Sequence, residues 1–138
     1  MRSVFLLIVM LVQGPYVHAE DTSDLLERVN AILSDADARV SGRLVTQLID
    51  ATENSKSLAE KIDVLAVLGE THIRQGNRDD ALVVLKRAID DAQQLPNSMK
   101  TSAQLKRIAL SYRSLGAWRS ATEIMERSER ITAKYGSK

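Results

Sequence analysis

Along most of the chain after Glu20, apolar residues recur at intervals of three and four, the spacing of one face of an α-helix. Aromatic residues make up only 4% of the chain, a balance that favours helices over a β-sandwich. The pattern predicts an all-α protein. The expected helices cover about residues 23–33, 38–52, 57–75, 78–95, 98–116 and 118–134.

Several residues mark where these helices begin and end. Ser57 and Glu60 have the spacing of a capping box, in which the Ser hydroxyl accepts from an early backbone N–H and the Glu carboxylate reaches back to the cap. Gly76 suits the left-handed conformation that ends helices, and Asn77 can cap the helix that follows. Pro96 stops that helix.

The third and fourth expected helices repeat as the fifth and sixth after a shift of 40 residues. Small residues recur where helices must approach closely, and large ones recur where a gap must be filled. A second shift, toward the N-terminus, gives a fainter match. Three tandem hairpins over about residues 22–54, 57–95 and 97–134 explain the pattern. The matched pairs are Leu65 with Leu105, Gly69 with Ala109, His72 with Tyr112, Gly76 with Gly116, Ala81 with Ala121, and Leu85 with Met125.

These positions resemble the tetratricopeptide repeat, with a small residue, an aromatic residue, Gly and Ala at fixed spacing. The resemblance covers residues 57–134 well and residues 22–54 poorly. Two departures stand out: the period is 40 instead of the family's 34, and His72 replaces an aromatic residue. The resemblance implies six helices in three antiparallel hairpins that form a short right-handed solenoid. A plain helical bundle is the alternative.

The first 19 residues differ from the rest of the chain. Arg2 gives the N-terminus a positive charge, and an apolar run follows over residues 4–12. Ala19 is a small residue of the kind that signal peptidases accept before the cleaved bond. We expect a cleavable signal peptide over residues 1–19, with the cut between Ala19 and Glu20, and a helical repeat domain over residues 20–138. A retained anchor and a buried N-terminal helix are the alternatives. The chain has no cysteine, so export to a bacterial periplasm or outside the cell would proceed without disulfides.

Catalytic chemistry has few candidate residues here. Beyond residue 19 the sequence has one histidine, His72, and no Gly-rich phosphate loop. His72 lies on the apolar stripe of its helix, which predicts a core histidine. The acidic pairs at residues 79–80 and 90–91 fit solvated helix faces. We therefore expect a protein that is not an enzyme and that uses no cofactor or metal.

Charge is distributed unevenly along the chain. Residues 20–95 carry nine basic and 15 acidic residues, whereas residues 96–138 carry nine basic and three acidic ones. The basic end could meet an acidic partner, or copies could stack acidic end to basic end. The alternative is that these charges only keep the helices soluble.

In tetratricopeptide proteins, the first helix of each hairpin lines a groove that binds peptides. The resemblance implies an exported adaptor or scaffold that binds a protein segment, and the basic C-terminal part favours a segment with acidic residues. The balanced total charge and the polar last helix predict no role for nucleic acid or membrane. A self-assembling structural protein that stacks through its charged ends is the alternative, and the apolar stripe of the first helix could form a homo-oligomer. Some family members bind the terminal carboxylate of a peptide with a clamp of Asn, Lys and Arg side chains. Only Asn30 and Arg107 correspond to clamp residues here, so we do not expect a full clamp. The groove residues expected are Asn30, Val67, Glu70, Ile73, Arg74, Lys106, Arg107, Leu110 and Arg113.

Overall fold

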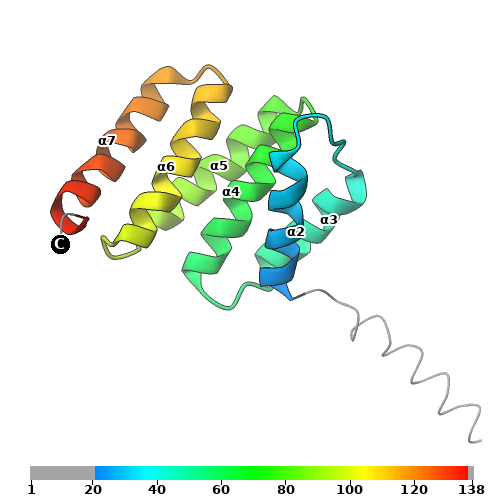
Figure 1. The fold of residues 1–138 in the computed structure, drawn as a ribbon, viewed down its shortest axis with the longest axis horizontal. Coiled ribbons are helices and arrows are strands. Elements are labelled where there is room, and N and C mark those ends of the chain that lie inside the picture. Colours follow the sequence, from blue (N-terminus) through cyan, green and yellow to red (C-terminus); the bar gives the residue numbers. More distant parts are fainter. Residues whose placement is uncertain (1–20, 137–138) are drawn as a thin grey trace, which may run out of the picture.

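The computed structural model describes residues 21–136, and within this range all regular structure is α-helical (Figure 1). The prediction of an all-α protein with six helices in three hairpins is confirmed. The expected signal peptide lies outside the described residues. No described helix is both long and apolar enough to cross a membrane. The helices are α2 (Thr22–Ser34), α3 (Gly42–Glu53), α4 (Leu58–Arg74), α5 (Arg78–Ala92), α6 (Met99–Ser114) and α7 (Trp118–Tyr135).

The first helices of the three hairpins pack against one another as a row, with α2 on α4 and α4 on α6. Each first helix also packs against the second helix of its own hairpin. In addition, α4 contacts α3, and α6 contacts α5. The first helix of the second and third hairpins therefore packs against both helices of the preceding hairpin. Figure 1 shows the three hairpins side by side, from α2 and α3 at one end to α6 and α7 at the other.

Helix α4 is buried on most of its circumference because it lies between two hydrophobic clusters. Ile62, Leu65 and Ala66 belong to the cluster formed with α5, α6 and α7. Val64 and Val67 belong to the cluster formed with α2 and α3. A helix that is apolar nearly all round is expected to lie inside a protein rather than on its surface.

The second helix begins four residues later than the sequence pattern predicts. The Oγ atom of Ser41 accepts a hydrogen bond from the backbone N of Leu44 at 3.2 Å, which caps α3. The preceding turn is stabilised by Asp35, whose Oδ1 accepts from the backbone N of Asp37 at 3.0 Å. These local polar contacts compete with helix formation, so residues 38–41 are not helical.

The capping box at Ser57 is confirmed with one change. The Ser57 Oγ accepts from the backbone N of Glu60 at 3.1 Å, but the Glu60 carboxylate accepts from the N of Lys56, also at 3.1 Å. Asn77 lies at the cap position of α5, yet its side chain makes no capping bond and instead donates to Gln75 Oε1 at 3.3 Å. The prediction of a side-chain cap there was wrong.

The turns after α4 and α6 have the same backbone geometry. Gly76 and Gly116 adopt φ values of +79° and +77°, the left-handed conformation that glycine accommodates best. After α4, the N of Asn77 donates to His72 O at 2.8 Å, and after α6 the N of Ala117 donates to Tyr112 O at 3.0 Å. The 40-residue repeat is therefore visible in the backbone hydrogen bonds that end the two helices.

Hydroxyl groups join α6 to α7 in the last hairpin. Ser102 Oγ donates to the carbonyl O of Ser128 at 2.9 Å, and Ser128 Oγ donates to the carbonyl O of Ser102 at 2.8 Å. The Thr132 hydroxyl lies 2.7 Å from Ser102 Oγ. The corresponding positions of the middle hairpin, 40 residues earlier, are all buried apolar residues: Ile62, Ala88 and Ala92.

Candidate functional site

One polar cluster joins all three helices of the row. Arg107 of α6 donates through Nε to Glu70 Oε2 of α4 at 2.7 Å, and through Nη2 to Asn30 Oδ1 of α2 at 2.6 Å. The Arg107 and Glu70 side chains are 35% and 29% exposed, so the ion pair is partly shielded from water. Three residues expected in a binding groove thus meet, but the charges of Arg107 and Glu70 neutralise each other and Asn30 accepts a hydrogen bond from Arg107.

A hollow of about 190 Å³ lies on the same side of the row. Four expected groove residues line it: Glu70, Ile73 and Arg74 of α4, and Leu110 of α6. Leu110 is 44% exposed, so its apolar side chain is accessible from the hollow. The remaining lining residues are Leu33, Ser111 and Ser114.

Arg74 has its guanidinium occupied by backbone carbonyl groups. It donates to the carbonyl oxygens of Leu33 at 2.6 Å, Asp35 at 2.9 Å and Ala38 at 3.1 Å. The carbonyls at the end of a helix have no partner inside the helix, and a basic side chain is one means of satisfying them. Arg74 therefore holds the connection between α2 and α3 and forms one wall of the hollow.

Three expected groove residues lie elsewhere. Val67 is 1% exposed, because α2 covers the side of α4 that helical spacing alone assigns to solvent. Its side chain cannot line an open groove. Lys106 and Arg113 line hollows between α6 and α7 instead of the hollow beside α4.

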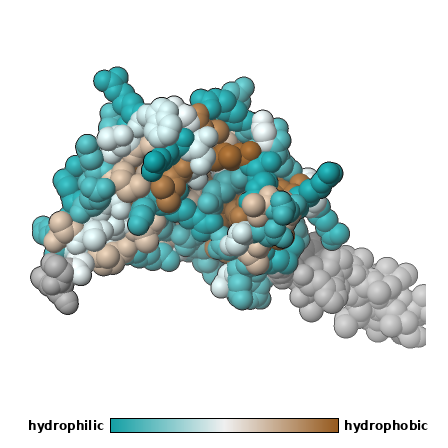
Figure 2. Space-filling view, turned by 45° about the horizontal axis from the view of Figure 1, so that its top comes forward, coloured by the Kyte–Doolittle hydropathy of each residue, from teal (hydrophilic) through white to brown (hydrophobic). Residues whose placement is uncertain are grey.

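Two larger hollows adjoin along α6 and α7, with volumes of about 580 and 450 Å³. They share Met125 and Glu129. Met99, at one end, is 45% exposed, and Trp118, at the other, is 61% exposed. In Figure 2, the left-hand part of the molecule, where α6 and α7 lie, carries pale and tan surface bordered by hydrophilic teal. This surface was not predicted from the sequence, although Trp118 lies at a helix start outside the apolar stripe and could have indicated it.

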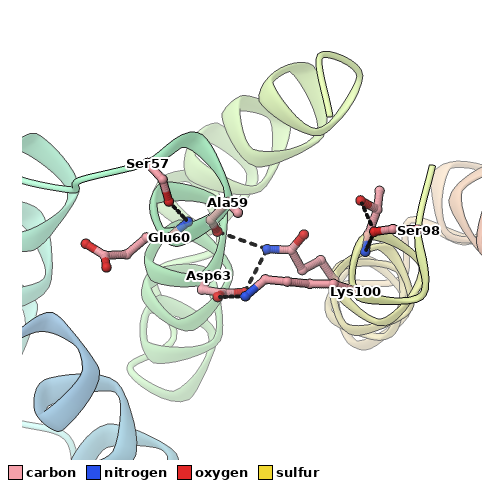
Figure 3. A network of polar contacts seen from close by, with 8 residues as sticks. Ser57, Ala59, Glu60, Asp63, Ser98 and Lys100 are labelled. Atoms are coloured by element: carbon pink, nitrogen blue, oxygen red, sulfur yellow. Dashed lines mark hydrogen bonds and ion pairs between the residues drawn. The ribbon is translucent and has the colours of Figure 1, made fainter. Parts of the chain in front are cut away.

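A second polar cluster joins the beginnings of α4 and α6 (Figure 3). Gln104 Nε2 donates to the carbonyl O of Ala59 at 2.9 Å and to Asp63 Oδ1 at 2.8 Å. Lys100 Nζ lies 3.4 Å from Asp63 Oδ2. These contacts fix the α4–α6 packing and leave Asp63 paired, so the cluster is structural. No pattern in the sequence pointed to it, because its residues are about 40 positions apart and do not repeat.

His72 is 7% exposed, in agreement with its prediction as a core residue. Its Nδ1 atom has no hydrogen-bond partner among the described residues. Residues 21–136 contain no group of three or more His, Asp or Glu side chains placed to hold a metal ion.

Comparison with models of protein families found no match. Comparisons with curated proteins and with solved structures likewise found no match for this chain.

Proposed function

We propose that this chain is an exported, non-enzymatic interaction module, an adaptor or scaffold whose row of first helices binds a segment of another protein. In this proposal the three hairpins form a right-handed, tetratricopeptide-like stack. Export rests on the signal-like pattern of residues 1–19.

The observation that carries the proposal is the hollow between α4 and α6, lined at its edge by α2. Ile73 and Leu110 contribute apolar side chains to its lining, and Ser111 and Ser114 contribute hydroxyl groups. Its volume of about 190 Å³ is suited to one side chain of a peptide and is below the 300–1,000 Å³ typical of small-molecule sites. A peptide lying across the row would place an apolar side chain there. The basic excess of residues 96–138 favours a peptide with acidic flanks.

A photo-crosslinking residue at position 110 tests this proposal. Leu110 is 44% exposed, so its replacement should leave the fold intact. Val83 of α5, which is 69% exposed and outside the hollow, is the matched control position. We expect one specific protein to be crosslinked from position 110 and not from position 83, and Leu110→Ser to reduce its capture. Equal crosslinking from both positions would contradict the proposal.

The intact mass of the exported protein tests the localisation. We expect the mature chain to begin at Glu20. A chain that retains residues 1–19 in the membrane fraction would instead support the anchor alternative.

A further inference from the structure

The outer face of the last hairpin forms what we call the α6–α7 groove, the two adjoining hollows between these helices. Ala103, Ala109 and Met125 lie along it, with Met99 and Trp118 at the two ends. Methionine and tryptophan are enriched at protein interfaces, where apolar centres are surrounded by polar rims. The groove has such a rim, formed by charged side chains on both helices.

The internal repeat shows what kind of partner fits the groove. In the middle hairpin, the equivalent surface of α4 and α5 is covered by α6, which packs on both helices. Ala66, Leu85 and Ile89 lie in or against the cluster formed there. Forty residues later, their counterparts are Lys106, Met125 and Glu129, and no described helix follows to cover them. The α6–α7 groove therefore corresponds to a surface that a helix covers in the middle hairpin. It differs from that surface by the charged side chains at its edges.

The charges at the edges have a regular arrangement. Lys106 and Arg113 lie on the α6 side, and Glu126 and Glu129 lie on the α7 side. All four are exposed. None of the ion pairs found in residues 21–136 includes them. Arg113 instead has its guanidinium carbon 5.7 Å from the centre of the Trp118 ring.

We infer that the α6–α7 groove binds the same groove of a second copy of this chain. A two-fold interface must be self-complementary, because the same patch is present on both sides. A surface with cations on one helix and anions on the other meets this condition when α6 of one copy lies antiparallel on α7 of the second. Lys106 and Glu129 line the same hollow, at similar height along the two helices. The arrangement therefore brings each lysine opposite the glutamate of the other copy.

Two other arrangements of the same surface are less favourable. Placing α6 on α6 would bring Lys106 and Arg113 against the same cations of the second copy. Extending the row by seating α2 of a second copy in the groove would bring in a helix whose Leu25 and Val29 are already buried in its own chain. The exposed residues of that helix include Asp24 and Glu27, which cannot fill an apolar floor.

Charge reversal tests the pairing. The purified chain is compared with Lys106→Glu, Glu129→Lys and an equal mixture of the two variants, by sedimentation and by native mass spectrometry with one variant isotopically labelled. We expect dimers of the unchanged protein, a dissociation constant raised at least about tenfold in each variant alone, and mixed dimers in the mixture. Lys86→Glu on α5, outside the groove, is the control and should leave the dimer intact.

Three outcomes would overturn the inference. A monomer at all concentrations of the unchanged protein would show that the groove does not bind a second copy. Absence of mixed dimers would contradict the pairing of α6 with α7. Oligomers that grow beyond two copies would indicate end-to-end stacking. Circular dichroism should show unchanged helicity in every variant, because all three positions are exposed. The inference does not depend on the proposed function, since Leu110 is not among the residues that line the groove.

Discussion

Gly69 of α4 lies directly against Leu85 of α5: a Cβ atom at residue 69 would be 2.6 Å from Leu85 Cδ2 and 2.8 Å from its Cγ. Leu85 is fully buried and cannot move aside freely. The absence of a side chain at residue 69 therefore sets how closely the two helices of the middle hairpin approach.

Gly69→Ala should lower the free energy of unfolding by about 1 kcal/mol, because overpacking costs about 1–3 kcal/mol and the gain in helix propensity offsets about 1 kcal/mol. The last hairpin carries Ala109 and Met125 at the matching positions. We therefore expect Gly69→Ala to cost much less when Leu85→Met is also present, since methionine adapts its shape more readily.

Chemical denaturation of the two single variants and the double variant gives the coupling between residues 69 and 85. A coupling near zero would contradict the close packing of α4 on α5.

The left-handed turns give a second prediction. Nothing lies within 4 Å of a Cβ atom built on Gly76 or Gly116, so alanine there meets only backbone strain. Gly76→Ala and Gly116→Ala should each lower stability by about 1–2 kcal/mol. Gly42→Ala, in the first turn of α3 and equally open, should raise it by up to about 1 kcal/mol. Thermal denaturation of the three variants checks the opposite signs.

Arg74→Met should loosen the connection between α2 and α3. It removes three charged hydrogen bonds to backbone carbonyls and should cost about 1–3 kcal/mol. Hydrogen exchange should increase chiefly at residues 35–41. Arg87→Ala is the control. Within residues 21–136, Arg87 makes one exposed ion pair, at 3.9 Å with Glu53, and its loss should change stability by no more than about 0.5 kcal/mol. A uniform increase in exchange over the whole chain would argue against a local role.

Tyr112 gives a prediction about alkaline pH. Burial, and secondarily the negative charge of Asp90, raises the pKa of the Tyr112 hydroxyl above its usual value of 10.0. The unfolded chain then loses this proton at a lower pH than the folded chain. The neutral Tyr112 hydroxyl therefore contributes to the free energy of unfolding. This contribution is fully present below pH 10 and is lost as the pH rises through the pKa of the folded protein. Tyr112→Phe should show a smaller fall in stability between neutral and alkaline pH, measured by denaturant titration. An identical fall in both proteins would contradict the raised pKa.

The parts of the fold that depend on local sequence could be predicted. Apolar spacing located all six helices, and Gly76 and Ser57 marked boundaries because their roles depend on neighbouring residues only. The start of α3 was missed because Ser41 and Asp35 compete with the helix through side-chain contacts that periodicity does not reveal.

The candidate site was harder to predict, because it depends on how the hairpins pack. Asn30, Glu70 and Arg107 were expected on one face and do meet. Val67 was expected on that face as well, but α2 covers it. The opposite case occurs on the outer face of the last hairpin, where Met125 is the repeat counterpart of the buried Leu85 but lines the open groove. Helical spacing predicts the side of a helix on which a side chain lies. Whether that side is exposed to solvent depends on how the neighbouring helices pack.

The hydroxyl groups between α6 and α7 have a consequence for how these helices can move. Contacts between apolar side chains, such as those of Ile62 and Ala88 in the middle hairpin, have no preferred bond direction. The Ser102 and Ser128 bonds are directional and reciprocal, so sliding α7 along α6 by one residue would break both at once. The last hairpin is therefore locked in a single register.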